Sequence, residues 1–277
     1  MAGAKNQVYY CHDIKDEVEY MAKVIQEEKK EQRLWRGMSL KPGSPLCSWL
    51  SRGLAVLFPI AVLLAVTWLL AGLTPYYAYQ FEKNGISDVT GIAKADLATV
   101  IEAMADYVVG RSDSMQVSVP INGVTEPIYG ERELKHMVDV RQIFDALRYT
   151  AAGYFFILLV FLAIDRKRIL GRLNQLARYG LWGTLIIALA LGVLVATDFT
   201  RYFYAFHELF FTNDLWLLDP ETDVLIQMLP EVFFRDMALA ILVLSFAFQW
   251  LFKLLSGQLL RLETIKNNGI DKEAPLC

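Results

Sequence analysis

Hydrophobic positions gather in four long runs along the chain, separated by segments rich in charge. Residues 53–73 and 179–197 contain no charged side chain, and the shorter runs 149–164 and 237–252 are flanked by arginine or lysine. The hydrocarbon layer of a bilayer is about 30 Å thick and a helix rises about 1.5 Å per residue, so about 20 apolar residues make one span. Long basic side chains beside a shorter run reach the headgroups and let it span as well. The pattern therefore predicts an all-α integral membrane protein with four transmembrane helices, the alternative being buried helices of a soluble protein.

The composition agrees with a membrane protein. Hydrophobic residues make up 55% of the 277 residues and the mean hydropathy is +0.33, which lies above the range of ordinary soluble domains. The first span begins too far into the chain and is too long for a cleaved signal peptide. We expect it to remain as a helix in the mature protein.

The distribution of charge predicts how the spans are oriented. Residues 165–178, between the second and third spans, contain five basic residues and one acid, which favours a cytoplasmic loop. The two segments on the other side are acidic: residues 74–148 have seven basic and eleven acidic residues, and residues 198–236 have two and eight. Both termini are then predicted to be cytoplasmic, where thiols stay reduced. The three cysteines, Cys11, Cys47 and Cys277, all fall on that side.

These predictions divide the chain into three parts. Residues 1–49 form a charged cytoplasmic helix and linker, residues 50–256 a four-span membrane catalytic domain, and residues 257–277 a cytoplasmic tail. The external segments 74–148 and 198–236 are expected to form a cap over the helices.

The N-terminal part has a helical pattern, because Ile14, Val18, Met21 and Ile25 recur at spacings of four, three and four. A solvated helix that rests on the headgroups is the simplest interpretation of this segment.

Local patterns predict the elements of the external segments. Residues 96–109 place apolar side chains on one helical face, and residues 116–121 alternate as a short strand does. Residues 131–150 contain no helix breaker and should continue into the second span. Asp219 and Pro220 resemble a helix start, with the acid as cap and the proline at the first helical position.

Two of the three histidines are predicted to meet at one depth. About 20 residues counted outward from Ile164 place the hydrocarbon edge near Phe144, and His136 lies eight residues beyond it. The same count along the third span places the edge near residues 198–199, and His207 again lies about eight residues beyond. Since a short loop joins these two spans, we expect them to be antiparallel neighbours. Their histidines would then lie at the level of the lipid esters.

Each histidine has neighbours that suit acid–base chemistry. Asp139 shares a helical face with His136 and could fix its tautomer, and Arg132 lies on the same face. Asn213 and Trp216 follow His207 within a segment rich in aromatics, which is typical of a membrane interface. The same features also suit two satisfied polar residues inside an aromatic anchor. A metal site is not expected, because the chain has no HExxH motif and no external cysteine.

Two motifs resemble those of a known family. Residues 130–141 (GERELKHMVDVR) and 206–236 (FHELFFTNDLWLLDPETDVLIQMLPEVFFRD), set among four spans, are similar to the lipoprotein intramolecular transacylase (Lit) family of Gram-positive bacterial membranes. The resemblance covers roughly residues 50–256. It implies transfer of the sn-2 acyl chain of a diacylglyceryl-cysteine to the α-amine of that cysteine, giving a lyso-form lipoprotein, with His136 and His207 implicated in catalysis. Diacylglyceryl-modified lipoproteins and membrane lipid are the implied partners, and no nucleic acid is expected.

The resemblance and the residues together give a hypothesis for the mechanism. One histidine acts as base towards the α-amine, the other donates to the departing sn-2 oxygen, and Asp139 orients His136. Arg132 or Asn213 stabilises the oxyanion, and Trp216 positions the substrate. No cofactor is implied, because an amide is more stable than an ester. A metal-dependent membrane hydrolase and a lipid-binding protein without chemistry are the alternatives.

Overall fold

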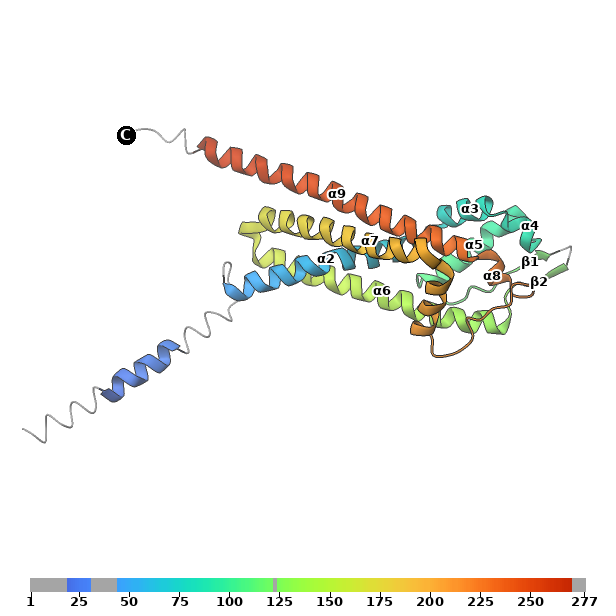
Figure 1. The fold of residues 1–277 in the computed structure, drawn as a ribbon, viewed down its shortest axis with the longest axis horizontal. Helices are drawn as coiled ribbons and strands as arrows, with labels where there is room; N and C mark the ends of the chain where they lie inside the picture. Colours follow the sequence, from blue (N-terminus) through green and yellow to red (C-terminus); the bar gives the residue numbers. More distant parts are fainter. Residues whose placement is uncertain (1–18, 31–43, 122–123, 271–277) are drawn as a thin grey trace, which may run out of the picture.

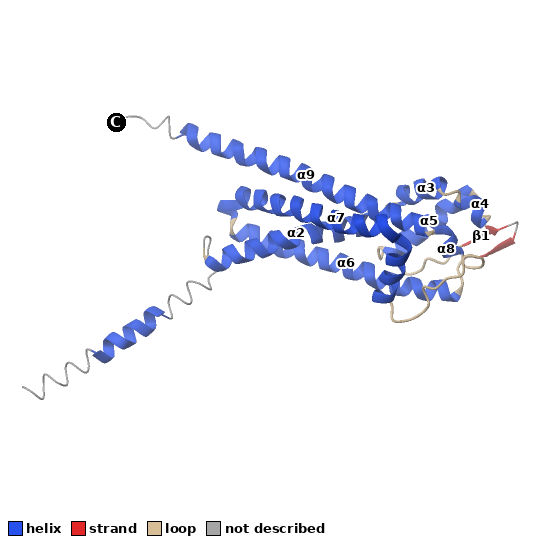
Figure 2. Ribbon diagram, in the orientation of Figure 1, coloured by secondary structure: helices blue, strands red, loops and turns tan. Residues whose placement is uncertain are grey.

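Four long helices form a bundle in the computed structural model, which describes residues 19–30, 44–121 and 124–270 (Figure 1). They are α2 (Pro45–Ala71), α6 (Glu131–Ile164), α7 (Ile169–Phe210) and α9 (Glu231–Ile270). Each contains a stretch long and apolar enough to cross a membrane. The predicted all-α, four-span membrane protein is confirmed, and helices dominate the structure throughout (Figure 2).

The helix α2 occupies the centre of the bundle. It packs against α6, α7 and α9, while α7 and α9 pack along each other. Within the described residues, α6 and α7 do not pack along each other, although only a short turn with one 3-10 helix (Arg166–Arg168) joins them. The prediction that these two spans are direct neighbours was therefore wrong.

Two glycines of α7 allow this helix to approach α2 closely. A Cβ atom added to Gly183 of α7 would lie 2.6 Å from Cγ of Pro59 of α2, and one added to Gly180 would lie 2.8 Å from Cδ1 of Phe58. Only glycine permits so close an approach, which is a common way of packing helices in membranes.

The segment between α2 and α6 folds into a compact unit at one end of the bundle. It contains α3 (Thr74–Lys83), α4 (Ile86–Thr90), α5 (Lys94–Val108) and an antiparallel pair of strands, β1 (Ser118–Ile121) and β2 (Val124–Pro127). The predicted helix at 96–109 corresponds to α5 and the predicted strand at 116–121 to β1, whereas β2 was not predicted. The apolar face of α5 is buried as expected: Leu97, Val100, Ile101, Met104 and Val108.

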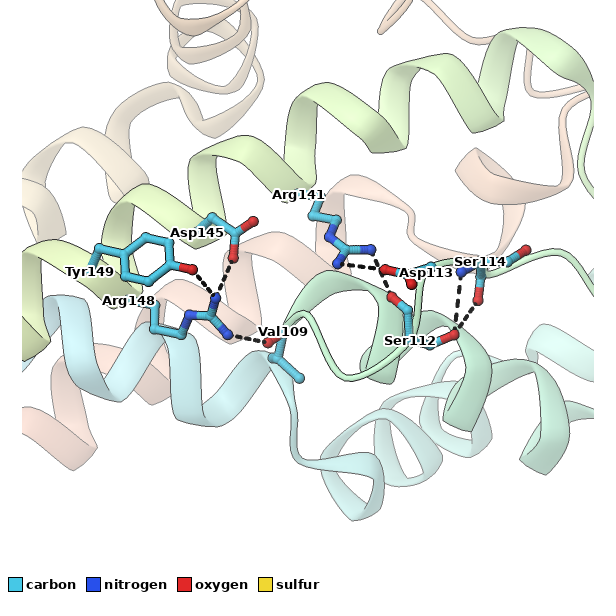
Figure 3. Close-up of polar contacts among 8 residues, drawn as sticks. All are labelled: Val109, Ser112, Asp113, Ser114, Arg141, Asp145, Arg148 and Tyr149. Atoms are coloured by element: carbon cyan, nitrogen blue, oxygen red, sulfur yellow. Dashed lines mark hydrogen bonds and ion pairs between the residues drawn. The ribbon is translucent and has the colours of Figure 1, made fainter.

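Two arginines of α6 fasten this unit to the bundle (Figure 3). Arg141 donates to the backbone oxygen of Ser112 at 2.7 Å and pairs with Asp113. About two turns further along α6, Arg148 pairs with Asp145 at 3.0 Å. It also donates to the backbone oxygen of Val109. The loop that follows α5 is therefore held against α6, which fixes the outer part of that helix.

The helix α7 bends at Asp198. This residue has φ −161° and ψ 83°, which no helix allows, and its carboxylate accepts a hydrogen bond from the backbone N–H of Arg201 at 3.0 Å. Asp198 thus ends one helix and caps the next. The part beyond the bend turns across the end of the bundle towards α6 (Figure 1). We call residues 199–210 the outer segment of α7.

The region after the outer segment is less helical than predicted. Residues 219–222 form a turn, in which the Asp219 carboxylate accepts from the backbone N–H of Glu221 at 2.9 Å. The short helix α8 (Val224–Met228) begins only after Asp223. The predicted helix start at Asp219 and Pro220 was therefore wrong, because the side chain of Asp219 stabilises a turn instead.

The opposite end of the bundle contains a buried polar cluster, which we call the Asp165 cluster. Asp165 is fully buried, and its Oδ2 accepts from Nε of Arg172 at 2.9 Å. Arg172 also donates to Oγ of Ser51 at 2.8 Å, and Ser51 donates to Gln175 at 2.9 Å. Sγ of Cys47 lies 3.8 Å from the same oxygen of Asp165. These contacts join the start of α2 to the turn between α6 and α7.

Two helical parts stand at the two ends of the described chain. Residues 19–30 are helical, with Met21 and Ile25 exposed, and Ile14 and Val18 lie outside the described residues. At the other end, α9 continues to Ile270, past the predicted boundary at residue 256.

Candidate active site

A cavity of about 840 Å³ lies where the outer segment of α7 crosses α6. Its walls come from α5, α6, α7, α8 and the first turns of α9, and almost all of its lining is apolar. The polar side chains that face it include both histidines of the two motifs, His136 and His207, together with Glu231.

The two histidines lie next to each other. Their ring centroids are 6.2 Å apart with an angle of 35° between the planes, and the residues are 7% and 9% exposed. The two side chains therefore meet, as the sequence analysis expected. The bend at Asp198 is what turns His207 towards α6, since α7 does not pack along α6 within the described residues.

Aromatic rings surround the histidine pair. Phe211 lies 5.0 Å from His136 and 5.5 Å from His207, measured between ring centroids. Phe203 and Trp216 lie 4.3 Å and 5.0 Å from His207. Trp216, which the sequence suggested for substrate positioning, is therefore in the wall of the cavity beside a histidine.

The hydrogen bonds of the two imidazoles differ. Nδ1 of His207 lies 2.7 Å from the backbone oxygen of Phe203, so in the neutral ring this nitrogen donates its hydrogen and Nε2 is the acceptor. Nδ1 of His136 is buried and has no hydrogen-bond partner among the described residues. Nε2 of His207 is thus left as an acceptor, whereas Nδ1 of His136 is enclosed by the protein.

Burial keeps both imidazoles neutral near pH 7. His136 lies about eight residues outside the spanning part of α6. Desolvation, together with the nearby His207, lowers its pKa to about 4 against the weaker opposite effect of Asp139. Desolvation also lowers the pKa of His207, which the Phe203 contact partly offsets. A neutral imidazole can accept a proton, as a general base must.

The polar neighbours expected around His136 have other contacts. Asp139 accepts a hydrogen bond from Nδ2 of Asn213 at 2.9 Å, and Oδ1 of Asn213 accepts from the backbone N–H of Leu215. Arg132 donates to the backbone oxygen of Asp214. None of Asp139, Asn213 and Arg132 lines the large cavity, and all three hold the loop that leads to Trp216.

A second, smaller cavity adjoins the first. It measures about 420 Å³, and Asp139 and Asn213 line it. Ile143 and Phe211 line both cavities and therefore form the wall between them.

Glu133 is a structural brace to which the sequence analysis gave no role. It is 2% exposed, and its two carboxylate oxygens accept from the backbone N–H groups of Gly130 and Leu225, both at 2.6 Å. The first bond caps α6, and the second ties α6 to α8, whose residues form the opposite wall of the cavity. The signal in the sequence was the spacing of three between Gly130 and Glu133, which matches half of a capping box.

Within the part of the chain that the structure describes, no three His, Cys, Asp or Glu side chains converge in a group that could hold a metal ion.

Comparison with known proteins identifies the family of this chain. Residues 53–234, more than half of the chain, match the family described as lipoprotein intramolecular transacylase Lit. A search of curated proteins gives no match.

Solved structures support the fold. The membrane-integral lipoprotein intramolecular transacylase Lit from Bacillus cereus is similar, with a TM-score of 0.60, 22% identity and coverage of 80% of this chain and 99% of that chain. A variant of that protein with a histidine changed to arginine is similar at 21% identity, with the same TM-score and coverage of 79% and 96%. A variant with an alanine replacement is similar at 22% identity, again with a TM-score of 0.60 and coverage of 79% and 97%. At this identity the likeness shows a shared fold, and the family assignment rests on the match over residues 53–234. The chain belongs to the lipoprotein intramolecular transacylase family and is an acyltransferase of the membrane.

Proposed function

We propose that this protein moves the sn-2 acyl chain of a diacylglyceryl-cysteine to the α-amine of the same cysteine. Membership of the transacylase family supports the class of reaction. The observation that carries the proposal is the pair of buried, neutral imidazoles, 6.2 Å apart, in an apolar cavity at one end of the membrane helices. The product is a lipoprotein with an N-acyl group and an S-monoacylglyceryl group.

The reaction needs one nucleophile and two proton transfers. The amine nitrogen attacks the ester carbonyl, a C–N bond forms, and the nitrogen loses a proton. The tetrahedral intermediate then breaks its bond to the sn-2 oxygen, which gains a proton and remains as a hydroxyl on the glycerol. The proton that the nitrogen loses passes through the histidine pair to the sn-2 oxygen, so both imidazoles end neutral, as they began. No acyl group leaves the substrate.

We assign the base to His207 and the proton donor to His136. The contact from Nδ1 of His207 to Phe203 leaves Nε2 as the acceptor, and that bond raises its basicity. His136 is neutral near pH 7, because its pKa lies near 4; once it receives the proton from His207, it gives this proton up readily to the departing oxygen. Unperturbed α-amines have a pKa of about 8, so a useful fraction is neutral and nucleophilic near pH 7.

The cavity contributes by orientation and by excluding water. Amine and ester belong to one molecule, and holding them together replaces a chance encounter by a fixed geometry. Apolar walls keep water, a competing nucleophile, away from the ester. Arg132, Asp139 and Asn213 hold the loop of Trp216, and we propose that they act on the reaction by positioning this wall.

We propose that the site faces the extracytoplasmic side. The short turn with Arg166, Lys167 and Arg168 lies at the opposite end of the bundle from the histidines, and basic short loops favour the cytoplasm. Both termini are then cytoplasmic. The catalytic groups face the outer leaflet at the depth of the lipid esters.

Mass spectrometry of a synthetic diacylglyceryl lipopeptide tests the function. The lipopeptide has a free N-terminal amine and is incubated with the wild type, His136→Ala and His207→Ala, with and without a chelator. We expect the total mass to stay unchanged while fragmentation places one acyl chain on the α-amine. Each alanine variant should lose activity by about 10²-fold to 10⁴-fold, the usual contribution of a general acid or base.

Three other outcomes would change the proposal. Loss of a fatty acid to water that depends on metal would favour a membrane hydrolase. Binding of the lipopeptide without any transfer by folded wild type would favour a lipid-binding protein. Full activity in either histidine variant would remove that residue from the mechanism.

A further inference from the structure

The large cavity extends from the histidines into the depth of the membrane. Besides the aromatic wall, its lining includes Leu191 and Leu194 of α7 and Ile143 and Phe144 of α6. Leu191 lies seven residues before the bend at Asp198, which is about 10 Å along the helix. The cavity therefore spans from the ester level to about a third of the way through the hydrocarbon layer.

The arrangement of the helices leaves this lower part open to lipid. Within the described residues, α6 and α7 do not pack along each other, because α2 lies against both. The outer segment of α7 turns across the end of the bundle towards α6 (Figure 1). Leu191 lines the cavity and is still 42% exposed, so the wall at this point is not closed by other protein side chains.

We infer that Leu191, Leu194 and Phe144 form an acyl-chain channel that holds the first part of the migrating chain and lets its end lie in the bilayer. The inference rests on the proposed function and adds a specificity: the enzyme fixes the chain near the ester and does not measure its length. All three side chains are apolar and the channel is continuous with the histidine pair.

The end of the acyl chain lies in a different place in a closed cavity and in an open channel. A closed apolar cavity selects a length, because a chain that is too long does not fit and one that is too short leaves part of the cavity empty. An open channel has neither effect, since a methylene group in lipid is as far from water as one in the protein. Contacts with the first methylene groups alone then orient the ester towards the histidines.

The channel is tested by narrowing it and comparing two substrates. The variant Leu194→Trp is assayed with diacylglyceryl lipopeptides that have either a hexadecanoyl or a butanoyl chain at sn-2. We expect the wild type to transfer both at similar rates. The variant should lower the transfer rate of the hexadecanoyl chain by about tenfold or more, because a misplaced ester reacts more slowly. The transfer rate of the butanoyl chain should fall by much less.

A matched control lies on the same helix. Leu189 is 63% exposed and is not in the lining of the cavity, so Leu189→Trp adds the same bulk facing lipid and should leave both rates unchanged. Leu191→Trp is the second test position and should show the same selective loss as Leu194→Trp. Because each variant is its own reference for the two substrates, partial misfolding lowers both rates alike and leaves their ratio unchanged.

The outcomes separate the channel from the function. Equal slowing of long and short chains in both channel variants, or a selective loss in Leu189→Trp, overturns the channel. A strong preference of the wild type for one chain length overturns it as well. Absence of transfer by the wild type with either substrate refutes the proposed function itself.

Discussion

The two ends of the helix bundle both contain buried polar groups, and they differ in what those groups face. In the Asp165 cluster, Asp165, Arg172, Ser51 and Gln175 bind one another, and none of them lines the large cavity. At the other end, the two imidazoles face aromatic rings and an apolar cavity. Polar groups that satisfy one another hold helices together. Polar groups that face a cavity are available to a substrate.

Breaking the Asp165 cluster should give the largest effect on stability. The change Arg172→Ala leaves the fully buried Asp165 carboxylate without its cation, and such a loss costs about 3–5 kcal/mol. We expect a large drop in the thermal unfolding midpoint in detergent, with the transfer rate of the protein that remains folded nearly unchanged. The exposed Arg168→Ala, in the same turn, is the control and should change neither. A catalytic defect in folded Arg172→Ala would contradict the division between the two ends.

Acid should destabilise the protein through the histidine end. The pKa of His136 falls to about 4 on folding, below an unfolded value of about 6.5, so the unfolded chain binds more protons between these pH values. Stability is therefore present above pH 6.5 and is lost as the pH falls towards 4, by up to roughly 3 kcal/mol. Thermal unfolding measured between pH 7 and pH 4 checks this, with His136→Gln as the reference. An equal loss in that variant would assign the effect to other groups.

The change Glu133→Gln tests the brace between α6 and α8. It replaces one acceptor oxygen by an NH2 group that faces a backbone N–H, and a buried group left without its partner costs about 1–3 kcal/mol. We expect a lower unfolding midpoint and a lower kcat, because Leu225 and its neighbours move relative to His136.

The control for the brace is on the same helix. Glu131 is exposed and pairs only with Lys135, so Glu131→Gln should be close to wild type. If Glu133→Gln lowered the midpoint and left kcat and KM unchanged, Glu133 would be structural only.

The smallest effect is expected for Arg132→Ala. Arg132 makes one described hydrogen bond, to the backbone oxygen of Asp214, at an exposed position, and such a bond contributes about 1 kcal/mol. The lipopeptide assay should show a change of a few fold. A loss of about 100-fold or more, with the fold intact, would instead support the hypothesis from the sequence that Arg132 stabilises the oxyanion.

The sequence by itself determined the four spans and the position of each residue along them. Apolar runs gave the four spans, and the constant rise per residue placed His136 and His207 at one level. The helical spacing of apolar residues predicted one face of α5, and all five residues of that predicted face are buried. These properties depend on positions along one helix, which the order of residues fixes directly.

Only the tertiary structure decided how the helices are arranged around each other. The hydrophobic pattern of a helix predicts where a residue lies along that helix. It does not predict which other helix packs against it. The approach of Gly183 to Pro59 brings α7 close to α2, which also packs against α6. The bend at Asp198 then turns His207 towards α6. The partners of Glu133 and Asp139 lie 92 and 74 residues away in sequence. Such contacts arise from packing in three dimensions, which no local pattern records.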